Sequence, residues 1–318
     1  METLITPCAG SSYRHEETWE REVSRILRAC LILLAFLLLL RIDSSDGTSK
    51  NDQLPLRTER SSPWDLEISG DWQGQAPGTR RYLRREDLFA LPQVSFTVKD
   101  DPNFDSPTAV RGIDLEALVR ALAVDIDRSI IVAVCNDWYR AYYPRRYREI
   151  HKPVLALELN GKQPSDWAKR RDGFSMGPYL ITHEHFVPTA RILSQQEVAQ
   201  IPWGVVRLEF WKEETLLASI KPHGPAAADP TVQSGYGVAR QNCLRCHGPE
   251  SEGPWKGKLS WEGIAFFASQ SAKNFAAYVR DPQSQAKDAQ MPGNPDFDDP
   301  TLQALIAYFQ TFQSAANP

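Results

Sequence analysis

The segment Cys243-Leu244-Arg245-Cys246-His247 constrains this 318-residue chain more than any other stretch. In the pattern Cys-x-x-Cys-His, two thiols form thioethers with the vinyl groups of one porphyrin, and the histidine gives an imidazole nitrogen to the iron. The spacing requires one helical turn between Cys243 and Cys246. A thioredoxin-like redox pair and half of a zinc site are the alternatives, but the first needs no histidine here. A zinc site needs two further ligands nearby, and no Cys or His follows His247. The motif therefore predicts one covalent haem c on Cys243 and Cys246, with His247 on the iron.

A second axial ligand is expected far along the chain, and Met291 is the candidate. The chain has only three methionines, and Met291 stands in Gln-Met-Pro-Gly, 44 residues after His247. The alternative is a methionine in an exposed loop. A haem with His and Met as axial ligands has no open coordination position, so it moves single electrons. We predict His247 and Met291 as the axial ligands, and no catalytic residue.

The remaining composition limits the class of protein. A net charge of −4 and a pI near 5.9 give no nucleic-acid signal. The length of 318 residues suggests about two domains, and a hydrophobic content of 42% is enough for them to form cores. Cys8, Cys30 and Cys135 are scattered, so no disulfide framework is expected. Haem attachment to this motif takes place outside the cytoplasm, which also predicts the compartment.

An apolar run near the N-terminus predicts a membrane anchor. Residues 29–40 are uninterrupted apolar, with Arg21, Arg25 and Arg28 before them and Arg41 after. The run has the length of a signal peptide, but no small-residue cleavage site follows it, and flanking arginines extend a span by snorkelling. We predict a single signal-anchor helix over residues 23–42, with residues 1–22 cytoplasmic and the rest of the chain on the extracytoplasmic side.

The middle of the chain reads as a mixed α/β domain over residues 64–216. Residues 94–98 alternate with period two, and residues 129–135 are a continuous, largely β-branched run typical of a buried strand. The dipeptide Asn160-Gly161 is a hairpin signal. Residues 217–230, rich in proline and alanine, are predicted to be a hinge.

Five segments give this middle region a family resemblance. They are Leu66–Gly70, Asp87–Pro92, Val110–Leu118, Asn136–Tyr139 and Leu155–Pro164. Over about residues 65–212 the order resembles the molybdopterin domain of the sulfite-oxidase family. In that family a cysteine just before the third segment binds molybdenum. The corresponding stretch, residues 99–105, has no cysteine, and Cys135 is expected to be a core residue. The resemblance therefore implies a degenerate relative, and we expect no molybdopterin.

Residues 231–315 resemble a class I cytochrome c over their whole length. Gly235 stands eight residues before Cys243, Met291-Pro292 matches the family's axial dipeptide, and Tyr308 lies in a final amphipathic helix over residues 301–312. The resemblance implies an all-α domain in which Gly235 lies where the first and last helices cross.

Two polar constellations have other interpretations. The segment Tyr139–Lys152 contains four Arg, four Tyr and a His, which could clamp an oxyanion. We favour a solvated face or a docking surface for an acidic partner. His183 and His185 would share a face of a strand, but no third metal ligand is evident.

The predicted fold class is multi-domain: an N-terminal membrane helix, an α+β sulfite-oxidase-like domain and an all-α cytochrome c domain. The predicted parts are residues 1–22 (polar N-terminus), 23–42 (membrane helix), 43–63 (linker), 64–216 (mixed domain), 217–230 (hinge) and 231–318 (haem domain).

The predicted function is a membrane-anchored monohaem cytochrome. It would carry electrons between protein redox partners at the outer face of a bacterial membrane, alone or as a subunit of a larger respiratory complex. The alternative is a molybdenum-dependent oxidoreductase fused to its own cytochrome acceptor. We favour electron transfer over a self-contained enzyme.

Overall fold

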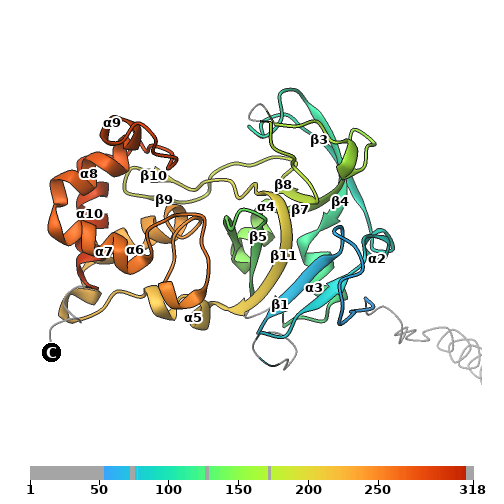
Figure 1. Cartoon of the computed structure of the whole chain (residues 1–318), viewed down its shortest axis with the longest axis horizontal. Coiled ribbons are helices and arrows are strands. Elements are labelled where there is room, and N and C mark those ends of the chain that lie inside the picture. The colour runs from blue at the N-terminus through green and yellow to red at the C-terminus, as the bar shows by residue number, and fades with distance from the viewer. Residues whose placement is uncertain (1–53, 72–75, 77, 126–128, 171–172, 313–318) are drawn as a thin grey trace, which may run out of the picture. The chain divides into compact units, whose positions relative to one another are not determined.

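A mixed β-sheet organises the first part of the described chain (Figure 1). The computed structural model describes residues 54–71, 76, 78–125, 129–170 and 173–312, and among them the sheet has nine strands. Seven follow the order β2-β1-β11-β8-β7-β4-β3, while β5 pairs with β11 and β6 pairs with β5. The strands are β1 (Leu66–Gly70), β2 (Arg81–Leu83), β3 (Val94–Val98), β4 (Thr108–Asp114), β5 (Ser129–Cys135), β6 (Arg140–Tyr143), β7 (Val154–Leu159), β8 (Tyr179–Thr182) and β11 (Trp203–Lys212); β9 (Arg191–Ile192) and β10 (Gln195–Gln196) form a separate ladder.

Short helices accompany this sheet. They are α2 (Arg85–Phe89), α3 (Leu115–Ala121), α4 (Arg145–His151) and the 3₁₀ turn η1 (Pro164–Asp166). Helix α3 begins at Leu115 because the Asp114 carboxylate accepts from the backbone N–H groups of Glu116 and Ala117. Its buried side chains pack with those of β1, β5 and β11 in one hydrophobic cluster.

Strand β5 is buried on both faces, as its uninterrupted apolar sequence predicts. Successive side chains point to opposite faces of a strand, so its residues divide between two cores. Ile131, Ala133 and Cys135 belong to the sheet cluster, and Ile130, Val132 and Val134 belong to a second cluster. The predicted strands over residues 94–98 and 129–135 are confirmed as β3 and β5.

The second cluster is built mainly by the C-terminal helices. These elements are α5 (Glu213–Leu216), η2 (Ala218–Ile220), η3 (Pro225–Ala228), α6 (Pro230–Asn242), η4 (Glu250–Glu252), α7 (Trp261–Gln270), α8 (Ala272–Arg280), α9 (Pro282–Gln285) and α10 (Asp299–Gln310). Helix α6 begins at Pro230 because Asp229 caps it, accepting from the backbone N–H groups of Thr231 and Val232.

Helices α6 and α10 approach each other at Gly235. A Cβ built there would lie 1.9 Å from the Ala304 carbonyl oxygen and 2.9 Å from the Tyr308 Cβ. Only glycine permits so close an approach. The rings of Tyr308 and Tyr236 lie 5.5 Å apart across the same contact. The predicted places of Gly235 and Tyr308 are therefore confirmed.

The predicted fold class is wrong. The C-terminal helices do not form an all-α domain with a core of its own, because they share their hydrophobic cluster with Ile130, Val132 and Val134 of β5. The described residues all belong to one compact unit. Leu217 and Ile220, in the segment predicted as a hinge, are buried in the shared cluster. Helical periodicity shows which stripe of a helix is buried, but it does not show what covers it.

The membrane helix of that fold class has no counterpart among the described residues. No helix in the part of the chain that the structure describes is long and apolar enough to cross a membrane. The predicted anchor over residues 23–42 and the polar segment 1–22 lie outside the described residues.

Candidate functional site

The Cys-x-x-Cys-His motif continues from the C-terminal end of α6 as one further turn. The Cys243 N–H donates to the Ala239 carbonyl at 2.8 Å, and the His247 N–H donates to the Cys243 carbonyl at 2.9 Å. The helical turn that the spacing requires between Cys243 and Cys246 is therefore present.

The proximal loop, residues 248–259, orients the His247 ring. His247 Nδ1 donates to the Leu259 carbonyl oxygen at 2.7 Å, because a carbonyl can only accept. This bond leaves Nε2 with a free lone pair, the arrangement found in histidines that bind metals. The loop also lies close to the ring, since a Cβ built at Gly257 would be 2.2 Å from His247 Cε1. Burial lowers the pKa of His247, which favours the neutral, metal-ligating form.

The two thiols of the motif are held in their neutral form. Burial raises the pKa of the Cys243 thiol to about 12, and burial also raises the pKa of Cys246. A thioredoxin-like pair needs the opposite, a nucleophile whose pKa is lowered. Across the described ranges, no group of three or more His, Cys, Asp or Glu could hold a metal ion. The raised pKa values disfavour the redox-pair interpretation.

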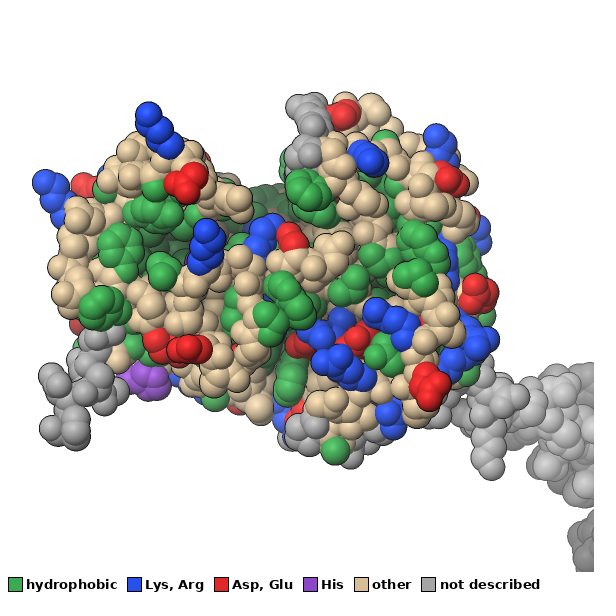
Figure 2. All heavy atoms as spheres, in the orientation of Figure 1, with side chains coloured by type: hydrophobic (Ala, Val, Ile, Leu, Met, Phe, Trp, Pro, Cys, Tyr) green, Lys and Arg blue, Asp and Glu red, His purple; other side chains and the backbone are tan. Residues whose placement is uncertain are grey.

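Met291 lies on the same hydrophobic cluster as the motif. Its side chain is partly buried and packs against the cluster that Cys243 and Trp255 also contact. Its backbone carbonyl accepts from Gln283 Nε2 at 2.8 Å, which ties this loop to α9. Figure 2 shows hydrophobic side chains gathered in a hollow over the C-terminal helices. The site offers two thiols, an oriented imidazole and a thioether in apolar surroundings. This set of donor groups fits a haem.

No family model matches the chain, and no curated protein matches its sequence. The candidate site therefore rests on its own residues.

Cys135 lies where the sequence predicts it, in the core. Its side chain is 2% exposed at the end of β5, and burial strongly raises the pKa of its thiol. It lines a cavity of about 190 Å³ together with Asp137, Tyr139 and Lys256. A protonated thiol is a poor metal ligand, because the thiolate is the ligand form.

The arginine- and tyrosine-rich segment is only partly a solvated face, because Arg145 and Arg146 are exposed whereas Arg140 and Arg148 are buried; the docking surface stays a prediction. Arg148 is fully buried, pairs with Glu116 and donates to the Tyr143 carbonyl at 2.7 Å. Arg140 is only 6% exposed. Buried charges are retained where partners neutralise them, and a glutamate from another element lies beside each arginine.

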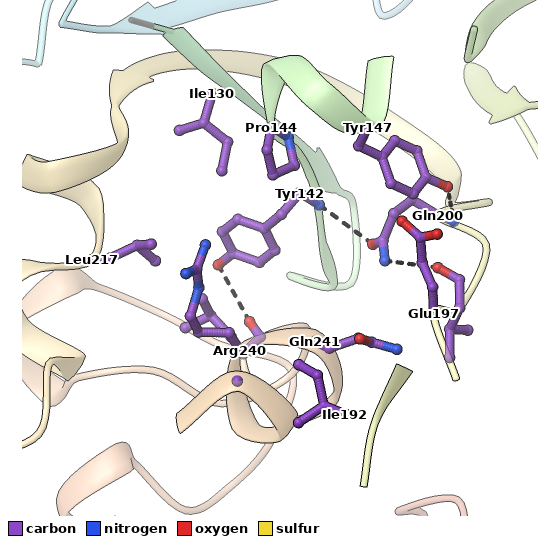
Figure 3. Close-up of a pocket in the computed structure, with 13 residues that line it drawn as sticks. Ile130, Tyr142, Pro144, Tyr147, Ile192, Glu197, Gln200, Leu217, Arg240 and Gln241 are labelled. Carbon is purple, nitrogen blue, oxygen red and sulfur yellow. Dashed lines mark hydrogen bonds between the residues drawn. The ribbon is translucent and has the colours of Figure 1, made fainter. Parts of the chain in front are cut away.

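The same segment contributes to a cavity of about 230 Å³ beside α6 (Figure 3). Its polar lining includes Tyr142, Tyr147, Glu197, Gln200 and Arg240. The Tyr142 hydroxyl donates to the Leu244 carbonyl at 3.2 Å, and the Tyr147 hydroxyl accepts from the Gln200 N–H at 2.8 Å. The cavity therefore lies between the sheet and the Cys-x-x-Cys-His motif.

His183 and His185 do not form a metal site. His183 is buried and its Nε2 lies 3.0 Å from the Tyr147 hydroxyl, whereas the His185 side chain is 68% exposed. Burial, with a smaller effect of neighbouring His151, lowers the pKa of His183 to about 4, while the Glu197 carboxylate opposes this shift.

This environment predicts acid sensitivity. The folded-state pKa of His183 lies below its unfolded value, so the unfolded chain binds the proton more readily. The contribution of neutral His183 to the free energy of unfolding is present in full above about pH 6.5. It falls by about 3 kcal/mol as the pH drops towards 4. Chemical denaturation of wild type and His183→Gln at several pH values should show a shallower pH dependence in the variant. His185→Gln, two residues away, should keep the wild-type slope; equal slopes in all three proteins would contradict the prediction.

Sequence reasoning missed the residues that join the sheet to the motif. The Arg140 N–H donates to the Arg245 carbonyl at 2.8 Å, and Lys256 Nζ lies 2.6 Å from the Asp137 carboxylate. These pairs are more than 100 residues apart in sequence. The one available signal was the apolar run of β5, because a strand buried on both faces needs a second covering layer.

Proposed function

We propose that this protein is a c-type cytochrome that transfers single electrons. One haem would be attached through Cys243 and Cys246, with His247 and Met291 as axial ligands. The observation that carries the proposal is the hydrogen bond from His247 Nδ1 to the Leu259 carbonyl, which turns Nε2 into an available ligand directly after two thiols at helical spacing. When bound, the haem supplies a one-electron couple.

The residues of the chain determine the environment of this one-electron couple. The hydrophobic cluster beside Cys243 excludes water, which favours a more positive reduction potential. The segment 217–230 is held by buried side chains and by a hydrogen bond from the Tyr308 hydroxyl to the Ile220 carbonyl. Electron exchange therefore requires redox partners that approach the C-terminal helices. It does not require these helices to move about segment 217–230. We place these partners at the outer face of a bacterial membrane, because this is where haem is attached to such motifs.

The deciding experiment uses the full chain, produced in the periplasm of a host with haem attachment machinery. We expect haem that survives denaturing electrophoresis, visible by its peroxidase activity, with one iron and no molybdenum per chain. Haem that dissociates on denaturation would contradict the proposal. One molybdenum per chain would instead support the alternative, a molybdenum-dependent oxidoreductase fused to its own cytochrome.

The role of Met291 has a separate test. Met291→Leu keeps the side-chain volume but removes the sulfur, so covalent haem should remain while the near-infrared sulfur-to-iron band disappears. The reduction potential should fall, because thioether ligation favours the reduced iron. Met176→Leu is the matched control, since Met176 is buried in the cluster beside β8. Retention of the band in Met291→Leu would assign the ligand elsewhere.

A further inference from the structure

We propose that the sheet sets the reduction potential of the haem through a buried charge pair, Arg140 and Glu209. This inference rests on the proposed haem attachment and gives the sheet a role in it. Arg140 acts as a positioning residue, through its fixed charge and its contacts with the proximal loop.

The backbone of Arg140 is tied directly to the attachment motif. Its N–H donates to the carbonyl of Arg245, which lies between the two cysteines. Two residues further along β6, the Tyr142 hydroxyl bonds to the Leu244 carbonyl (Figure 3). Strand β6 therefore holds both residues between Cys243 and Cys246 by their carbonyl groups.

The Arg140 side chain reaches the other side of the motif. Its guanidinium carbon lies 4.0 Å from the centroid of the Trp255 ring, a cation–π contact. The Trp255 ring covers Gly248, where a Cβ would lie 1.8 Å from the indole, and Trp255 Nε1 donates to the Pro249 carbonyl at 3.2 Å. Gly248 follows His247 directly. The Trp255 indole therefore lies between the Arg140 guanidinium and the backbone next to His247.

The charge of Arg140 is only partly neutralised. Its Nη1 lies 3.8 Å from Glu209 Oε2, and its buried Nε has no hydrogen-bond partner among the described residues. The Glu209 carboxylate is shared, since its Oε1 also lies 2.8 Å from Arg207 Nε in a second ion pair and its Oε2 accepts from Trp211 Nε1 at 3.0 Å. Both side chains of the pair are about nine-tenths buried, so solvent and salt screen them weakly.

A fixed charge beside a redox centre changes the equilibrium between its two states. Reduction adds one negative charge, which a nearby cation stabilises and a nearby anion destabilises, and more strongly in a low-dielectric interior. Arg140 therefore raises the potential and Glu209 lowers it. If the ion pair only held the structure together, both variants would shift the potential in the same direction, because removing either partner breaks the same ion pair.

The test measures the midpoint potential of the full-length haem protein by redox titration. Arg140→Gln should shift the potential down, Glu209→Gln should shift it up, and Arg140→Lys should stay near wild type because the charge is kept. Arg111→Gln and Glu158→Gln make the same substitutions at a more exposed ion pair and serve as controls. This pair, 3.2 Å apart, lies on β4 and β7, away from β11 in the sheet order, and its variants should leave the potential unchanged.

The outcomes separate this inference from the proposed function. Absence of covalent haem in the wild type overturns the function itself. With covalent haem present, shifts of the same sign in Arg140→Gln and Glu209→Gln, or shifts no larger than those of the controls, overturn the inference. If Arg140→Gln does not fold, Glu209→Gln and Arg140→Lys decide: an upward shift in the first with none in the second supports the inference, and any other result overturns it.

Discussion

The Cys243→Ala, Cys246→Ala double variant will carry no covalent haem. Each thiol is expected to form one thioether, so removing both removes every bond between the chain and the porphyrin. Intact mass spectrometry should give the mass of the polypeptide alone, and denaturing gels should show no peroxidase activity. The loss should be complete, in contrast to the graded effects expected from changes around the site.

The third cysteine of the described residues provides the control. Cys135→Ala removes a more deeply buried thiol from the sheet core, at a cost of about 1 kcal/mol in stability, and should keep full haem attachment. Loss of haem in Cys135→Ala, or a haem adduct in the double variant, would contradict the assignment of the attachment thiols.

Gly235→Ala will lower the free energy of unfolding by about 2–3 kcal/mol. The added Cβ would lie 1.9 Å from the Ala304 carbonyl oxygen, so α6 and α10 must separate along their contact. The oxygen belongs to the backbone and cannot move aside by changing a rotamer. Urea denaturation followed by circular dichroism measures the change.

Gly263→Ala is the matched control, because it makes the same substitution inside a helix, α7. A Cβ built there has ordinary contacts, the nearest at 3.5 Å. Alanine favours a helix by about 1 kcal/mol over glycine, so this variant should be as stable as wild type or more stable. Equal stability of Gly235→Ala and wild type would show that the helices can separate without loss.

The sequence predicts best those features that local patterns encode. The β-branched run over residues 129–135 identifies β5 as a buried strand, and the alternation over residues 94–98 identifies β3. The turn between Cys243 and Cys246 follows from the spacing of the motif. Each of these features depends on neighbours within a few residues.

Features that depend on distant partners were predicted wrongly or missed. Charged residues such as Arg140 and Arg148 suggest exposure, but Glu209 and Glu116 from other elements make their burial possible. Leu217 and Ile220 stand in a stretch whose proline and alanine content suggests a hinge, yet their side chains are buried. The predicted fold class was wrong for the same reason. The sequence shows that β5 is buried on both faces, but it does not show which elements cover the second face.

The division of β5 between two cores has a consequence for biogenesis. Synthesis runs from the N-terminus, so β5 and its partner β11 are complete before the helices that follow them. At that stage the apolar face formed by Ile130, Val132 and Val134 has no cover. The nascent sheet therefore offers an apolar surface on which α6 can pack. The haem-attachment motif, which follows α6 in the chain, then appears next to a sheet that has already formed.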